Sequence, residues 1–213
     1  MPIDNARFWD RAARSYAADP IADVEGYERT LRETRRLLRA GDAIYEFGCG
    51  TGTTALRLAP SVARYAATDI SGEMIAIARE KAEAEGAAAA NIEFAVGTPE
   101  AAPWPDASFD AVLAFNVLHL IAARESALRG AHRLLKPGGV FISKTPCLKE
   151  MSVLIRLAVP LMQAVGKAPY VAMLSAEALE EEIAAAGFEI VDRARHGSKK
   201  KQEPRIFLTA RKP

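Results

Sequence analysis

The amino-acid sequence predicts an α/β domain built on a mostly parallel sheet of seven strands. Short apolar segments alternate with helical segments between residues 43 and 144, a pattern typical of parallel strands joined by right-handed crossovers. A glycine-rich turn follows the first apolar segment at residues 48–52. Two further strand-like segments near the C-terminus are joined by the polar residues 197–201, which favours a hairpin and therefore an antiparallel last strand.

The composition and charge of the chain are typical of a single globular domain and not of a nucleic-acid-binding or membrane-spanning protein. The chain has 213 residues, half of them hydrophobic and 26% charged, which suits a single domain with a buried core. The net charge of +1 argues against nucleic acid as a partner, because phosphate binding usually requires a basic excess. Residues 1–10 lack the apolar core of a signal peptide, and no apolar run is long enough to span a membrane. A soluble protein is therefore expected.

The two cysteines, Cys49 and Cys147, lie in no metal-binding cluster, so no structural zinc or other metal site is predicted. A disulfide between them is possible in principle. Two thiols in a chain of this length are more typical of a reduced, cytoplasmic protein, and that location is the one expected here.

The elements follow in order along the chain. Two helices are expected first, at residues 4–17 and 23–39, and Gly41 is placed at the C-terminal end of the second. Five apolar strands follow, at residues 43–47, 64–68, 92–96, 110–115 and 140–144. Helices are expected between them at residues 53–59, 72–85 and 123–135, with a Lys-Pro-Gly-Gly turn at 136–139.

The C-terminal part has a different character. Residues 151–165 are strongly apolar and contain Pro160, which kinks or breaks a helix. This segment is interpreted either as a helix buried on the sheet or as a cap over a substrate. Ser175 then caps a helix that Gly187 ends, and strands follow at residues 188–194 and 205–210.

The glycine-rich turn, Glu46-Phe47-Gly48-Cys49-Gly50-Thr51-Gly52, is the strongest functional signal. Glycines let the backbone turn sharply and approach a ligand closely, at the sheet edge where α/β proteins bind ligands; an ordinary tight turn is the alternative. A dinucleotide fingerprint needs its third glycine at position 53, which is Thr53. Glu46 would also repel a pyrophosphate, whereas it suits a cationic ligand.

These residues, together with the acidic Asp69 after the second strand, resemble the class I S-adenosylmethionine-dependent methyltransferases. The likeness is greatest to the ubiquinone/menaquinone-biosynthesis methyltransferases and covers roughly residues 8–145. It implies a Rossmann-like three-layer sandwich, S-adenosyl-L-methionine as cofactor, S-adenosyl-L-homocysteine as product, and in-line methyl transfer to a small molecule.

The resemblance also implies the cofactor-binding residues, which are Tyr16, Glu46, Gly48, Cys49, Gly50, Asp69, Ile70, Met74, Thr98, Asn116 and Val117. Glu46 and the glycine loop would hold the methionine part of the cofactor. Asp69 would accept hydrogen bonds from the ribose hydroxyls, although by itself it is equally a helix cap. Thr98 stands where many relatives carry an aspartate that reaches the adenine, so some adenine contacts are expected to be lost.

His119, just after the fourth strand, is the candidate general base if the acceptor must lose a proton. The alternative is a histidine that only packs beside the cofactor loop. His132 and His196 are weaker candidates, and His132 is interpreted as structural.

A single domain, 1–213, is expected, with an N-terminal helical cover (1–40), a cofactor-binding core (41–145), a substrate cap (146–175), and a C-terminal helix with strands (176–213). The apolar cap predicts a small lipophilic acceptor. Four cations could face an acidic head group or a membrane surface: Lys144, Lys149, Arg156 and Lys167. The chain is expected to be a monomer or a homodimer. The alternatives are a catalytically silent, methyltransferase-like partner subunit and, less favoured, an NAD-dependent oxidoreductase.

Overall fold

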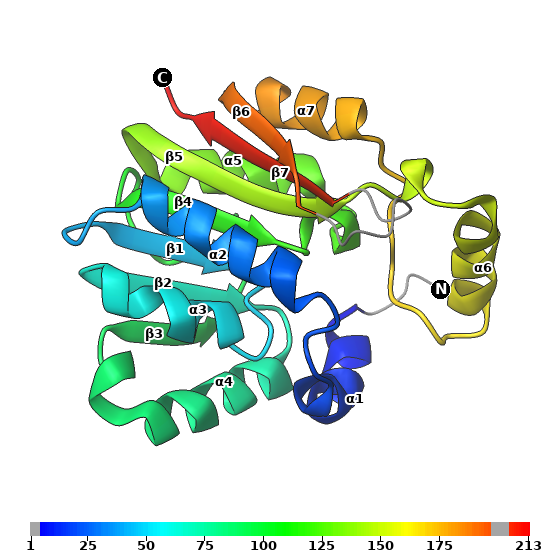
Figure 1. Ribbon diagram of the computed structural model, residues 1–213, viewed down its shortest axis with the longest axis horizontal. Helices are drawn as coiled ribbons and strands as arrows, with labels where there is room; N and C mark the ends of the chain where they lie inside the picture. The colour runs from blue at the N-terminus through cyan, green and yellow to red at the C-terminus, as the bar shows by residue number, and fades with distance from the viewer. Residues whose placement is uncertain (1–4, 197–204) are drawn as a thin grey trace.

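The computed structural model describes residues 5–196 and 205–213, and within these ranges seven strands form one sheet (Figure 1). Their order across the sheet is β3-β2-β1-β4-β5-β7-β6. The strands are β1 (Ala43–Phe47), β2 (Arg64–Asp69), β3 (Ile92–Val96), β4 (Phe109–Phe115), β5 (Leu135–Pro146), β6 (Glu189–Arg195) and β7 (Arg205–Arg211).

Strands β1 to β5 pair in parallel, whereas β7 is antiparallel to both of its neighbours, β5 and β6. The predicted fold class and the antiparallel last strand are therefore confirmed. The polar residues 197–201 that were expected to join the hairpin lie outside the described residues, as does the expected helix start at Asp4.

Helices cover both faces of the sheet, which gives the three-layer sandwich (Figure 1). The hydrophobic clusters place α2, α3 and α4 on one face and α5 and α7 on the other. The helices are α1 (Asn5–Ala18), α2 (Val24–Leu37), α3 (Thr53–Leu58), α4 (Gly72–Glu85), α5 (Arg124–Leu134), α6 (Val153–Ala164) and α7 (Ala176–Ala185), with short 3-10 turns η1 (Ala59–Ser61), η2 (Gly86–Ala89), η3 (Leu118–Leu120) and η4 (Leu148–Glu150).

The side chains of strand β1 alternate between the two hydrophobic clusters, one on each face of the sheet. Ile44 packs in the cluster that contains Leu31 of α2, whereas its neighbour Tyr45 packs in the opposite cluster beside Trp104 and Phe109. Successive side chains on a strand point to opposite faces, so a strand that is covered on both faces must be apolar throughout. This is the pattern that identified the strands in the sequence.

The N-terminal helix α1 is fixed against α4 at the carboxyl end of the sheet. Ala13 packs with Met74 and Ile77 of α4. The Oδ1 atom of Asp10 accepts a hydrogen bond of 2.7 Å from the hydroxyl of Ser71, which is itself the N-cap of α4 through its bond to the Met74 amide. Helix α1 therefore stands over the edge where the strands end.

Two local predictions were wrong. Helix α2 ends at Leu37 with an extended cap at Leu38, so Gly41 is not its C-terminal residue. The expected turn at residues 136–139 belongs to the long strand β5, where the pairing with β4 shifts register between Phe109 and Ala111. An irregular pairing of this kind accommodates the extra residues as a bulge, in which Gly138 has a φ of 74°.

The apolar segment after β5 is helical, but none of its residues is buried. Of the two interpretations, a helix buried on the sheet is therefore wrong, because Leu154, Leu157 and Leu161 are each at least 68% exposed. Across the described part of the chain, no helix has the length and apolar character that a membrane span requires.

Candidate functional site

A cavity of about 700 Å³ opens at the carboxyl ends of β1, β2 and β4. The strand order changes direction there, because β2 and β3 lie on one side of β1 and β4 on the other; this is where open α/β sheets bind ligands. Every site residue that the sequence predicted lines this one cavity, namely Tyr16, Glu46, Gly48, Cys49, Gly50, Asp69, Ile70, Met74, Thr98, Asn116, Val117 and His119.

The glycine loop adopts a conformation that other residues rarely take. Gly48, Gly50 and Gly52 all have positive φ, of 67°, 53° and 74°. A Cβ on Gly48 would collide with the side chain of Val117, and one on Gly52 would lie 2.9 Å from the Ala78 Cβ atom. The glycines are therefore required both by backbone geometry and by space, and they leave the backbone open to the cavity.

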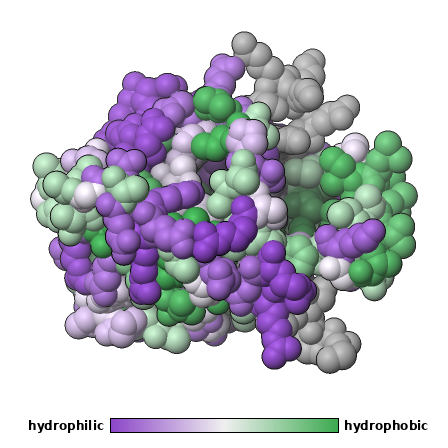
Figure 2. Space-filling view, turned by 90° about the horizontal axis from the view of Figure 1, so that it is seen from below, coloured by the Kyte–Doolittle hydropathy of each residue, from purple (hydrophilic) through white to green (hydrophobic). Residues whose placement is uncertain are grey.

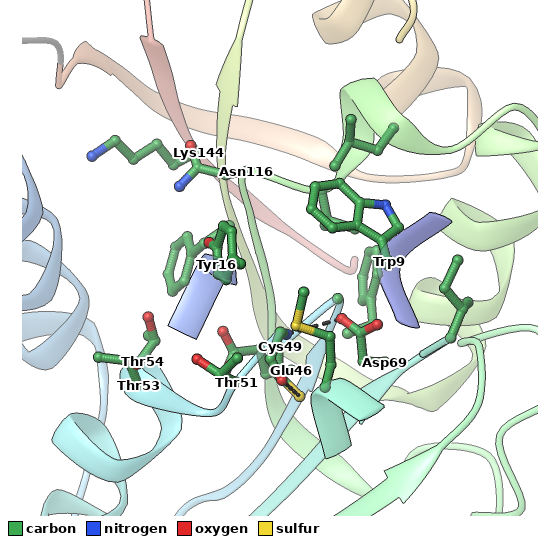
Figure 3. Close-up of a pocket in the computed structure, with 18 of the residues that line it drawn as sticks. Trp9, Tyr16, Glu46, Cys49, Thr51, Thr53, Thr54, Asp69, Asn116 and Lys144 are labelled. Atoms are coloured by element: carbon green, nitrogen blue, oxygen red, sulfur yellow. Dashed lines mark hydrogen bonds between the residues drawn. The ribbon is translucent and has the colours of Figure 1, made fainter. Parts of the chain in front are cut away.

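Asp69 fixes the loop from the end of β2. Its Oδ2 atom accepts a hydrogen bond of 2.9 Å from the amide of Gly50, and its Oδ1 atom accepts one of 3.0 Å from the amide of Ser71. Burial raises the pKa of this carboxyl, against the lowering effect of these amides. Each carboxylate oxygen can still accept a further bond. Figure 3 shows Asp69 between the loop at Cys49 and the indole of Trp9.

Glu46 is a second carboxyl on the same wall. It is 2% exposed, and its Oε2 atom accepts a hydrogen bond of 3.0 Å from the hydroxyl of Tyr65. Burial raises its pKa to about 7, with a further contribution from the negative charge of Asp69. A carboxyl held in this way strongly favours a cation beside it, because a positive charge offsets the loss of hydration.

Helix α1 forms another wall of the cavity. Tyr16 is 53% exposed and lies over the loop, where a Cβ on Gly50 would be 3.8 Å from its Cε1 atom. Its ring meets Trp9 edge to face, with 6.0 Å between the centroids. Both aromatic side chains are drawn facing the loop in Figure 3.

A residue with a strained backbone directly follows strand β4. Asn116 has a φ of 53°, a left-handed conformation that asparagine tolerates better than most residues, and its amide donates to the Lys144 carbonyl at 2.7 Å. His119 follows in the turn η3. Burial first, and the charge of Arg205 second, lower the pKa of His119 to about 4. Its buried Nδ1 atom has no hydrogen-bond partner among the described residues, so this side of the ring is turned into protein while the residue lines the cavity.

Lys144 does not face the surface, contrary to the expectation for the four cations. It is 3% exposed, and its Nζ atom donates to Thr30 Oγ1 at 2.8 Å and to the Gly26 carbonyl at 3.1 Å. Burial lowers its pKa to about 8. In Figure 3 its amine points away from Asp69, toward α2.

The cavity also contains residues that the sequence did not predict, and Lys81, Glu100 and Arg205 are three charged examples. Lys81 of α4 donates to the hydroxyls of Thr51 and Thr53, at 2.8 and 3.2 Å, and so braces the glycine loop. Glu100 and Arg205 also line the cavity. No local pattern marks any of the three, because each reaches the cavity from an element that is distant in sequence from the loop. His132 and His196 do not line it.

The sequence was compared with known families and proteins. Residues 45–143 match the family described as "Methyltransferase domain". The 27-O-demethylrifamycin SV methyltransferase of Amycolatopsis mediterranei is 36% identical over 58% of this chain and 47% of its own length. The ubiquinone/menaquinone biosynthesis C-methyltransferase UbiE of Brucella anthropi is 39% identical over 49% of this chain and 40% of its own length. The chain thus spans less than half the length of these curated relatives.

Solved structures share the fold over a larger part of the chain. The [4+2]-cyclase SpnF superposes with a TM-score of 0.80 at 23% identity, covering 100% of this chain and 98% of that one. Phosphoethanolamine N-methyltransferase 2 of Haemonchus contortus, in complex with S-adenosyl-L-methionine, has a TM-score of 0.78 at 18% identity over 99% of this chain and 60% of that one. At these identities the likeness concerns the fold, which hosts more than one chemistry.

Proposed function

We propose, on the premise that the chain belongs to the class I S-adenosylmethionine-dependent methyltransferase family, that it transfers the methyl group of S-adenosyl-L-methionine to a small lipophilic acceptor. The family uses this cofactor. The observation that carries the proposal is the meeting of two buried carboxyls, Glu46 and Asp69, at one glycine loop in one cavity.

The donors and acceptors along this wall fit the cofactor. Glu46, buried with a pKa of about 7, would take the cationic amino-acid end of the ligand, since a positive charge beside it restores the ionised form. Asp69 would accept hydrogen bonds from the ribose hydroxyls with its remaining lone pairs. The Cβ-free Gly48 and Gly50 would let the ligand lie against the backbone.

The remaining predicted residues would complete the cofactor site. Ile70, 38% exposed, and the buried Met74 would lie against the adenine. The hydroxyl of Thr98 would accept a hydrogen bond from the adenine amino group. Tyr16 would close over the methionine end from α1, opposite Asn116 and Val117. A pyrophosphate would instead meet the Glu46 carboxyl beside the loop, which argues against a dinucleotide and hence against the oxidoreductase alternative.

When bound, the cofactor supplies an electrophilic methyl group: the acceptor's lone pair bonds to the methyl carbon while the carbon–sulfur bond breaks and its electron pair stays on sulfur. The chain's own contribution would be alignment of the two reactants and exclusion of water. His119 is neutral at pH 7, because its pKa is about 4. It would accept a hydrogen bond from an acceptor hydroxyl and take the proton as transfer proceeds.

The acceptor is proposed to be lipophilic because apolar side chains line part of the cavity, among them Ile21, Leu120, Ile121 and Pro146. Such a lining favours a ligand whose apolar surface is buried and whose orientation is set by a few polar groups.

The test begins with binding. Calorimetry on the purified full chain is expected to detect binding of S-adenosyl-L-methionine and of S-adenosyl-L-homocysteine, but no binding of NAD. The labelled methyl donor is then supplied with extract of the source cells and the products are partitioned. Label in the organic phase that disappears with Asp69→Ala supports the proposal.

Other outcomes decide between the alternatives. Label that stays in the aqueous phase contradicts a lipophilic acceptor. Binding without any transfer favours the silent-partner alternative, and binding of NAD alone favours the oxidoreductase.

A further inference from the structure

Helix α6 carries its most apolar side toward solvent. Leu154, Leu157, Leu161 and Val165, which we call the α6 stripe, are 80%, 68%, 68% and 61% exposed. They lie within about 80° of one another on a helix of 3.6 residues per turn. An ordinary surface helix turns this side inward. Figure 2 shows a hydrophobic surface at one end of the molecule, whereas the rest of that face is a mixture of hydrophilic areas and smaller hydrophobic ones.

The charges within residues 151–176, the segment that contains α6, have one sign. Between residues 151 and 176 the ionisable charges are Arg156 and Lys167, and no acidic residue occurs, in a chain whose overall charge is only +1. Both side chains belong to exposed residues. An apolar helix side in a segment that carries cations and no acidic residue complements an anionic lipid surface, where the head groups attract the cations and the acyl region accepts the leucines.

We propose that α6 docks the protein on an anionic bilayer surface. The helix lies on the membrane and does not cross it, because its 12 residues give a length of about 18 Å, less than the hydrocarbon thickness of about 30 Å. A second copy of the chain is a poorer match for the stripe. A stable dimer buries about 800 Å² on each partner, more than four aliphatic side chains offer.

The chain that follows α6 connects the docking surface to the rim of the cavity. The amide of Tyr170 donates to Asn5 Oδ1 at 3.0 Å, and the amide of Ala172 donates to the carbonyl of His119 at 2.7 Å. Both Asn5 and His119 line the cavity. In Figure 1, α6 and α1 stand on the same side, beyond the carboxyl ends of the strands. Docking through α6 therefore brings the cavity rim close to the lipid.

The test is vesicle flotation of the full chain. Vesicles of phosphatidylglycerol and phosphatidylcholine are expected to carry the protein upward, and pure phosphatidylcholine vesicles to carry less of it. Leu157→Glu and Leu161→Glu are each expected to lower the partition coefficient at least about tenfold, since burial of one leucine favours transfer by roughly that factor or more. Val191→Glu, at an exposed valine of β6 (55%), is the matched control and should float like the unmodified protein.

The proposal is overturned if the unmodified chain does not float with anionic vesicles, or if Val191→Glu loses as much binding as the stripe variants. It is also overturned if sedimentation detects a dimer that the stripe variants dissociate, because a second copy then covers α6. Circular dichroism establishes that each variant is folded. Flotation requires neither cofactor nor methyl transfer, so its failure leaves the proposed function intact. Likewise, failure of the methyl-transfer test leaves the docking proposal intact.

Discussion

Replacing Glu46 by glutamine tests whether a buried, uncompensated carboxyl prepares the cavity for a cation. The folded-state pKa of Glu46 is about 7, against an ordinary value of 4.5. One pKa unit corresponds to about 1.4 kcal/mol, so the ionised carboxyl destabilises the ligand-free fold by about 3 kcal/mol at most. The hydrogen bond from Tyr65 already offsets part of the desolvation and is included in that pKa.

The sign of the pH dependence follows from proton binding. Between pH 4.5 and about 7 the folded protein keeps the Glu46 proton and the unfolded chain releases it. The free energy of unfolding therefore falls as the pH rises through this window, and the loss is complete above pH 7. Glu46→Gln removes the titration, so the variant is expected to gain up to about 3 kcal/mol relative to the unmodified protein between pH 5 and pH 8.

Urea denaturation of the ligand-free protein, followed by circular dichroism at pH 5, 6, 7 and 8, measures this difference. Glu189→Gln, at an exposed glutamate of β6, serves as the matched control and should follow the unmodified protein. If the stability curves of Glu46→Gln and the unmodified protein run parallel over this range, the raised pKa is not real and the electrostatic reasoning fails.

Cofactor binding should depend on pH in the opposite sense to the stability of the ligand-free protein. Because a cationic ligand needs ionised Glu46, the affinity of the unmodified protein for S-adenosyl-L-methionine should rise from pH 6 to pH 7 and level off above it. Glu46→Gln should bind more weakly, by roughly tenfold or more, and lose this pH dependence. Calorimetry in buffers of different ionisation enthalpy would detect the proton that the unmodified protein releases on binding near pH 6.

Three further predictions follow from the same cavity. Asp69→Ala removes the acceptor of the Gly50 amide and should weaken binding of S-adenosyl-L-methionine by about 10- to 100-fold in calorimetry; unchanged affinity would mean that the carboxyl does not hold the ribose. Gly52→Ala meets Phe94 at 2.9 Å in a left-handed conformation and should lower the free energy of unfolding by about 1–3 kcal/mol, measured by urea denaturation; a neutral result would contradict the tight fit. His119, with its pKa of about 4, should give no inflection near pH 6.5 in the methyl-transfer rate, and one that disappears with His119→Gln would show an ordinary, solvated imidazole.

The strand assignments show why much of the fold could be predicted. Ile92–Val96 and Ala43–Phe47 have the bounds that their apolar character indicated, because parallel strands covered on both faces must be apolar and stop where turn residues begin. The glycine loop could be predicted equally well. Its backbone has positive φ at closely spaced positions, and glycine is the residue that adopts this conformation most easily. These features are encoded within a few neighbouring residues.

Helix α6 shows where the pattern was ambiguous. An apolar helix has the same composition whether it packs on a sheet or faces solvent, because periodicity defines a face but not what covers that face. Lys144 is the reverse case, a charged residue that was expected outside and is buried beside Thr30. In both cases the environment is set by packing between segments that are remote in sequence, as the contact of Lys144 with Thr30 of α2 shows.

By itself the sequence determined the class of fold, the order of its elements and the loop at which a ligand would lie, because strand burial and glycine conformation are local constraints. Tertiary structure alone decided that Lys81 braces the loop, that Tyr65 donates to Glu46, and that α6 exposes its leucines. Contacts of this kind depend on packing between distant segments. The desolvation that sets the pKa of Glu46 arises only when those segments close around it.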